Sequence, residues 1–96
     1  MMNIEIIDLR LLPGNRPLKA FCDVRVNDII IKDFRILQDN GRPYVKAPFV
    51  TYKNKVGTLR FRQIIDLPGE VRTRINNMIL SEYYREKEQI HEQGSQ

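Results

Sequence analysis

Cations and aromatic rings are concentrated in one stretch of the sequence, residues 41–65, which contains no Asp or Glu. Six Lys or Arg residues interleave there with four aromatic residues: Arg42, Lys46, Lys53, Lys55, Arg60 and Arg62 with Tyr44, Phe49, Tyr52 and Phe61. Cationic side chains pair with phosphates, and exposed rings stack on bases. The combination therefore favours contact with nucleic acid, and the plainer alternative is a basic loop that is merely solvated.

The charge of the chain is unevenly distributed along it. The first 40 residues carry six basic and six acidic side chains and are neutral, whereas residues 41–80 carry eight basic side chains against Asp66 and Glu70, a local charge of +6. Residues 81–96 carry two basic and four acidic side chains, a local charge of −2. These sums give the net charge of +4, so an anionic partner is expected to meet the middle of the chain.

Residue types that carry out catalysis are sparse. His91 is the only histidine, Cys22 is the only cysteine and lies in an alternating apolar stretch, and the five glycines are isolated, so no metal site, reactive thiol or phosphate-binding glycine loop is indicated. Asp23 and Asp33 are best explained by cross-strand ion pairing. We expect no enzyme activity, no metal, no cofactor and no small-molecule substrate. The alternative, a metal-dependent nuclease, would degrade DNA in magnesium.

The elements that position these residues begin with three strands. Apolar and polar residues alternate at 3–12, 18–26 and 29–38, and the turn formers of 13–17 and Asn27-Asp28 separate these stretches. The pattern predicts an antiparallel meander, because short turns join neighbouring antiparallel strands.

A two-residue turn at Asn27-Asp28 predicts the register of the second hairpin. Val26 would pair with Ile29, and Asp23 would lie opposite Lys32 as a favourable cross-strand charge pair. Asp33 would then share a face with Ile29, which predicts a β-bulge between them.

The basic stretch is predicted to contain two short strands and a loop. A fourth strand is expected at 44–47, residues 49–58 lack a clear period and are predicted to form an exposed basic loop, and 59–64 alternates as a fifth strand. In that strand the two arginines share the outer face, while Phe61 is directed into the core.

A helix is expected to follow. Asp66 is a candidate cap, Pro68 suits the first turn, and Glu70 lies near the positive end of the helix dipole. Apolar residues then recur at spacings of three and four, at Val71, Ile75, Met78, Ile79 and Tyr83. Residues 86–96 are polar and offer little to bury, so the end of the helix is expected to fray.

The order of elements predicts an α+β fold, an antiparallel β meander of about five strands closed by one C-terminal helix, in a single domain over residues 1–85 with a polar tail at 86–96. One helix covers one face of the sheet, yet the first and third strands carry apolar residues on both faces: Ile4, Ile6, Ile7 and Leu9, and Ile29, Ile30, Ile31, Phe34, Ile36 and Leu37. A homodimer is the simplest cover for the second face.

The hydropathy of the sequence indicates neither a signal peptide nor a membrane-spanning segment. Acidic residues interrupt the first apolar residues before a signal-peptide core could form, and no later apolar run approaches membrane-spanning length. We expect a cytoplasmic protein without membrane contact.

Several runs of the sequence form a set with a characteristic order and spacing: IDLRL at 7–11, KAFCDVRV at 19–26, IIKDFRI at 30–36, YVKAP at 44–48 and RFRQI at 60–64, followed by the helix through Arg72, Ile75 and residues 80–83. This set resembles the stage V sporulation protein G (SpoVG) family of bacteria. The resemblance covers residues 4–84, and it lies in the shared order and spacing of runs that are individually unspecific.

The resemblance implies a homodimeric, non-enzymatic bacterial regulator of transcription, connected with sporulation and septation, that binds DNA and in some members RNA. In the family, nucleic-acid contacts belong to the basic loop and strand before the last helix and to that helix. The matching positions here are Arg60, Arg62, Arg72 and Arg74, and the loop adds a lysine pair of its own, Lys53 and Lys55. These six are the expected nucleic-acid-binding residues.

This chain departs from the family pattern just before the helix. A His-Pro pair usual in the family is replaced by Asp66-Leu67-Pro68, and the approach to the helix is one residue shorter. The preferred target sequence therefore does not carry over from relatives. A competing interpretation is a protein-interaction module that uses an exposed sheet edge and the acidic tail.

Overall fold

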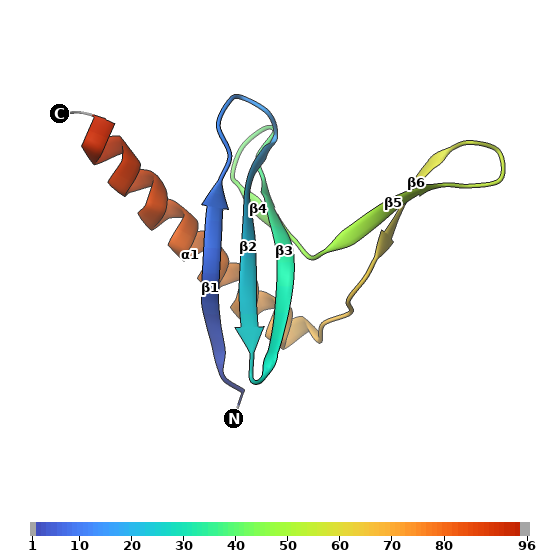
Figure 1. Cartoon of the computed structure of the whole chain (residues 1–96), viewed down its shortest axis with the longest axis horizontal. Helices are drawn as coiled ribbons and strands as arrows, with labels where there is room; N and C mark the ends of the chain where they lie inside the picture. Colours follow the sequence, from blue (N-terminus) through green and yellow to red (C-terminus); the bar gives the residue numbers. More distant parts are fainter. Residues whose placement is uncertain (1, 95–96) are drawn as a thin grey trace.

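The computed structural model describes residues 2–94, with side chains up to Gln89. Its elements are β1 (Ile4–Leu11), β2 (Leu18–Val26), β3 (Ile29–Leu37), β4 (Tyr44–Lys46), β5 (Phe49–Lys53), β6 (Leu59–Gln63) and α1 (Gly69–Gly94). The chain is α+β, as predicted: an antiparallel sheet in the order β1-β2-β3-β4, a separate two-stranded sheet of β5 and β6, and a C-terminal helix (Figure 1).

The hairpin between β2 and β3 has the predicted register from the turn to the Val24–Ile31 pair. The register then shifts at Asp23, so the predicted pairing of Asp23 with Lys32 is wrong. Val26 pairs with Ile29 across the Asn27-Asp28 turn, and Asn27 has a φ of 55°. Asparagine tolerates this left-handed conformation better than most residues. Its side-chain oxygen also accepts a hydrogen bond from the backbone N–H of Asn3 at 3.0 Å, which ties the start of β1 to the turn.

Bulges in β1 and β3 bring most of the apolar residues of these strands to one face. The β1 register shifts between Ile6 and Asp8, and the β3 register shifts opposite Asp23, where Asp33 has a φ of 68°. A bulge reverses the alternation of faces beyond it. The predicted bulge near Asp33 is confirmed, whereas the expectation of two broadly apolar faces is wrong.

The residues that the bulges align form the core beneath the sheet. Ile4, Ile6, Leu9 and Leu11 of β1 and Ile31, Phe34 and Ile36 of β3 all belong to it or pack against it. Ile7, Ile29 and Ile30 remain exposed. The core face therefore takes most of the apolar side chains of β1 and β3.

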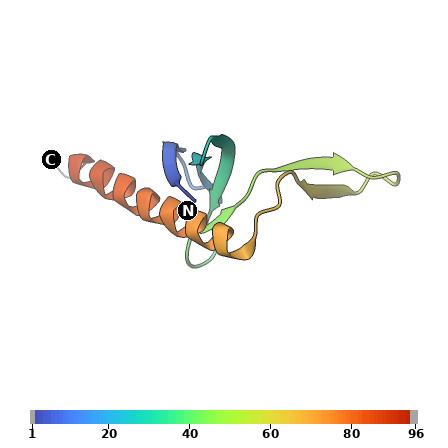
Figure 2. The ribbon, with the colours of Figure 1, turned by 90° about the horizontal axis from the view of Figure 1, so that it is seen from below.

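Helix α1 closes the other side of this core, crossing the face of the sheet opposite the outer face (Figure 2). Ile75, Ile79 and Tyr83 are buried, which confirms the predicted stripe. Cys22 is also fully buried, and this burial raises the pKa of its thiol to about 12, so it serves as a small apolar side chain. Among the described residues, no helix has the length and apolar character needed to cross a membrane.

The helix begins at Gly69, so its cap position is two residues later than the predicted cap, Asp66. The carbonyl of Pro68 accepts a hydrogen bond from the N–H of Arg72 at 2.9 Å, so Pro68 occupies the cap position and the prediction of Asp66 as the cap is wrong. The helix continues through Gly94, and the side chains from residue 90 onward, including His91, lie outside the described part.

Residues 49–63 form a β-hairpin that projects from the rest of the chain, and we call it the arm (Figures 1 and 2). The prediction of a loop at 49–58 is wrong, since β5 occupies its first half and pairs with β6. Neither strand pairs with the larger sheet. The radius of gyration, 15.1 Å, exceeds the roughly 13 Å of a compact domain of this size because the arm and the end of the helix project.

Candidate nucleic-acid interface

The tip of the arm is a structured turn organised by Asn54. Its side-chain oxygen accepts hydrogen bonds from the N–H groups of Val56 at 3.1 Å and Thr58 at 2.9 Å, and its carbonyl accepts one from Gly57 at 3.0 Å. Gly57 has a φ of 86°, which a side chain would strain. Lys55 is consequently presented, exposed, at the end of the arm.

One side of the arm carries its two arginines, and we call it the arginine face. Tyr52 pairs with Arg60 and Val50 pairs with Arg62, and paired residues project to the same side of a ribbon. The two arginines are two positions apart, so their Cα atoms lie about 6 to 7 Å from each other. All four side chains are exposed.

The opposite side of the arm carries Phe49 and Phe61. The Phe61 ring meets the Phe49 ring edge-on, with centroids 5.5 Å apart and an interplanar angle of 69°. Phe61 is nevertheless 61% exposed, so the prediction that it lies in the core is wrong. Alternation correctly separated Phe61 from the arginines, but β6 pairs only with β5, so neither of its faces meets the core.

Two cations from the larger sheet pack on these rings at the base of the arm. The Arg35 guanidinium lies 4.1 Å from the Phe49 centroid and donates a hydrogen bond to the Phe49 carbonyl at 3.4 Å. The Lys46 ammonium lies 5.1 Å from the Phe49 centroid and 5.3 Å from the Phe61 centroid. Such cation–π contacts help to orient the arm, and they leave the positive charges of Arg35 and Lys46 without a neutralising carboxylate.

The predicted binding residues fall into three places. Lys53, Lys55, Arg60 and Arg62 lie on the arm, and none of these four forms an ion pair within residues 2–89. Arg72 lies at the base of the arm, where its side chain lines a cleft with Phe61 and Lys46. Arg74 is two residues further along the helix, about 200° around its axis, and therefore points away from the arm.

Lys46 is the residue that sequence reasoning did not select for this site. Its side chain is exposed on β4. Its position over Phe61, however, depends on the path of the chain from β4 into the arm. The local sequence pattern does not predict that path.

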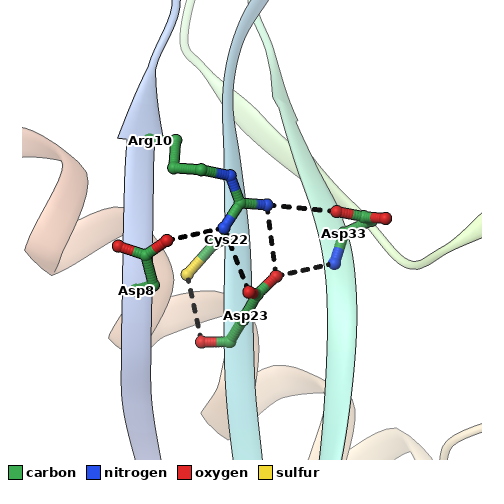
Figure 3. A network of polar contacts seen from close by, with 5 residues as sticks. All are labelled: Asp8, Arg10, Cys22, Asp23 and Asp33. Carbon is green, nitrogen blue, oxygen red and sulfur yellow. Dashed lines mark hydrogen bonds and ion pairs between the residues drawn. The ribbon is translucent and has the colours of Figure 1, made fainter.

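A second polar cluster lies on the outer face of the larger sheet, around Arg10 (Figure 3). Its guanidinium contacts Asp8 at 2.7 Å, Asp23 at 3.0 Å and Asp33 at 3.1 Å. Asp23 also accepts a hydrogen bond from the N–H of Asp33 at 3.0 Å. The expected ion pairing of the aspartates is present, but Arg10, and not Lys32, forms the pairs.

The charges of this cluster stabilise one another. Burial tends to raise the pKa of Asp23, but the hydrogen bonds from Arg10 and from the Asp33 amide outweigh it, so the pKa of this carboxyl is lowered. Hydrogen bonding to Asp23 and Asp8 in turn raises the pKa of Arg10. Among the described residues, no group of three or more His, Cys, Asp or Glu side chains is placed to hold a metal ion.

Comparison with known proteins adds no family to these observations. No protein-family model matches the chain, and no curated protein is significantly similar to it.

Proposed function

We propose that this protein binds nucleic acid, DNA in the first place and RNA as the alternative, through the arm. The observation that carries the proposal is the arm itself, which combines four cations, no carboxylate and exposed rings on a projecting two-stranded ribbon. A ribbon of this width fits the major groove of DNA. Exposed cations without ion-pair partners give up little when they meet phosphates.

The contacts expected from the arm would position the protein on the nucleic acid and would not discriminate between base sequences. Arg60 and Arg62 on the arginine face, with Lys53 and Lys55 nearer the tip, would contact phosphates, which are the same in every sequence. Arg72 would add a contact at the base, whereas Arg74 would need a separate segment of the nucleic acid.

Salt dependence of affinity tests this proposal. Each phosphate neutralised on duplex DNA contributes about −0.9 to the slope of log affinity against log salt, so four contacts give a slope of roughly −3 to −4. Fluorescence anisotropy of a labelled duplex between 50 and 200 mM salt, a range over which such complexes weaken strongly, measures it. An affinity that does not change over this range would contradict the proposal.

The resemblance to the SpoVG family supports a more specific version of this proposal, a homodimeric cytoplasmic regulator of bacterial transcription without enzyme activity. The runs that carry the resemblance include RFRQI at 60–64, which forms most of β6. Dimer formation is supported by the apolar side chains that the single chain leaves exposed away from the arginine face and the Phe49–Phe61 rings: Ile29, Val56, Leu59 and Ile64.

A protein-interaction module is the second candidate function. The free edge of β1 and the exposed apolar residues of the arm favour it. Strand addition or apolar docking changes little with salt, so the same titration separates the two functions.

A further inference from the structure

A cleft lies in the angle between the arm, β4 and the start of α1, and we call it the elbow cleft. Its volume is about 370 Å³, at the small end of the roughly 300 to 1,000 Å³ typical of ligand sites. The Phe49 and Phe61 rings supply apolar surface, and Lys46 and Arg72 supply positive charge. No carboxylate from the described residues lines the cleft.

Phe61 is preorganised as a stacking platform. The edge-on contact with Phe49 restricts its ring, and Phe49 is itself restrained by Arg35. More than half of the Phe61 surface remains open to solvent. An ordered, exposed ring stacks on a flat ligand at low entropic cost, because its orientation is already set.

Lys46 and Arg72 select a flat ligand that is also anionic. The Lys46 ammonium is held within 5.3 Å of the Phe61 centroid, and Arg72 approaches the cleft from the first turns of the helix. A phosphate joined to a stacked group would therefore meet two cations. Gln63, also in the lining, uses its amide N–H to bind the Ile65 carbonyl at 2.8 Å and so keeps its oxygen available as an acceptor.

We propose that the elbow cleft binds one unpaired nucleotide of a single strand, with its base stacked on Phe61 and its phosphate between Lys46 and Arg72. The inference rests on the proposed function and specifies the form of nucleic acid. A base inside a duplex is stacked on both faces and cannot reach Phe61, whereas an unpaired base exposes a π-face. Single strands thus use the cleft in addition to the cations of the arm, whereas duplexes meet those cations without placing a base in the cleft.

A tryptophan reporter tests the cleft directly, because the protein contains no native tryptophan. In Phe61→Trp, a single-stranded DNA of about 12 nucleotides, a length that single-strand-binding folds cover, should quench emission by stacking. The same sequence as a duplex should not. Leu59→Trp is the matched control, since it lies on the same side of the same exposed strand, nearer the tip and outside the cleft lining. Equal quenching at both positions, or equal quenching by both DNA forms, would overturn the proposal.

Affinities of two further variants separate this proposal from the proposed function. Phe61→Leu should weaken single-strand binding roughly 10- to 100-fold and leave duplex binding unchanged, while Arg60→Ala with Arg62→Ala should weaken both. If the native protein binds neither form, the proposed function and this inference both fail. If it binds and Phe61→Leu weakens both forms equally or neither, this inference alone fails. Tryptophan emission of the Phe61→Trp variant that shifts with protein concentration in the absence of DNA would show a second copy in the cleft and would also overturn it.

Discussion

Arg60 and Arg62 illustrate how a residue's place in the fold defines its role. They share the arginine face with Tyr52, project from a strand without a core behind it, and form no ion pair with a described residue. Solvated strand arginines on an ordinary sheet would show the same alternation. The projecting ribbon is what makes them accessible to a large polyanion.

Replacing both arginines, Arg60→Ala with Arg62→Ala, should weaken binding to all sequences similarly and flatten the salt slope by about one to two units. The reason is the loss of two phosphate contacts that do not read bases. Anisotropy titrations at several salt concentrations measure both effects, and circular dichroism should show an unchanged fold.

The control for this variant must remove two charges without touching the arm. Arg16→Ala with Lys32→Ala does so, since both side chains are exposed and belong to the neutral first part of the chain. Arg10 is unsuitable because it bridges three aspartates. Equal losses from the control and from the arginine pair would remove the reason to place the site on the arm.

Arg10 is expected to matter for stability and not for binding. Arg10→Ala leaves Asp8, Asp23 and Asp33 facing one another and removes hydrogen bonds to the half-buried Asp23, at a cost of about 1 to 2 kcal/mol. Urea denaturation measures this loss. A midpoint equal to that of the native protein would contradict the expectation.

The same cluster predicts how stability depends on pH. Because the pKa of Asp23 is lower in the folded chain than in the unfolded chain, its contribution is complete above its unfolded pKa near 4 and is lost as pH falls through the folded pKa. Stability of the native protein, measured by urea denaturation across this pH range, should therefore fall below about pH 4. Arg10→Ala should show a shallower fall over the same range.

At the scale of elements, the arm and the helix-covered sheet are separable. The arm shares no strand pairing with the larger sheet, and its base is fixed by a few contacts, among them the Arg35 hydrogen bond and the hydrogen bond from Ile64 N–H to the Pro48 carbonyl at 3.1 Å. A two-stranded ribbon of this kind contributes little burial.

Shortening the arm tests this separation. Replacing residues 52–60 by Asn-Gly connects the Thr51–Phe61 pair by a two-residue turn suited to a hairpin. The melting temperature should change by only a few degrees, about the effect of 1 kcal/mol in a domain of this size, while affinity for nucleic acid falls steeply. A shortened chain that fails to fold would show that the outer arm stabilises the sheet.

The whole molecule exposes more apolar surface than its small core suggests. Val56 is 83% exposed, and Ile29 and Ile64 are each more than 60% exposed. Burial of such residues is worth about 25 cal/mol per Å². Self-association that buries these side chains would therefore lower the free energy of this elongated chain.

Light scattering at micromolar concentration should accordingly give the mass of a homodimer, and this mass should change little between low and high salt because the contact is apolar. A monomer mass would contradict the proposal. The bulges matter here, since they remove most of the apolar outer face on which a sheet-to-sheet dimer would depend.

Local pattern determined much of this fold. Alternation placed β1, β2, β3 and β6, the Asn27-Asp28 turn set the register between β2 and β3 as far as the Val24–Ile31 pair, and spacings of three and four defined the buried stripe of α1. These features follow from neighbouring residues, because strand and helix periods are local properties.

Tertiary structure alone decided what each face meets. The loop expected at 49–58 contains β5, whose pattern is indistinct because a ribbon with two solvated faces has no reason to segregate apolar from polar residues. Phe61 looked like a core residue because alternation reports opposite faces without reporting which of them is covered. The contacts of Arg10 and the elbow cleft likewise join residues distant in sequence, so their existence depends on long-range packing that no local period encodes.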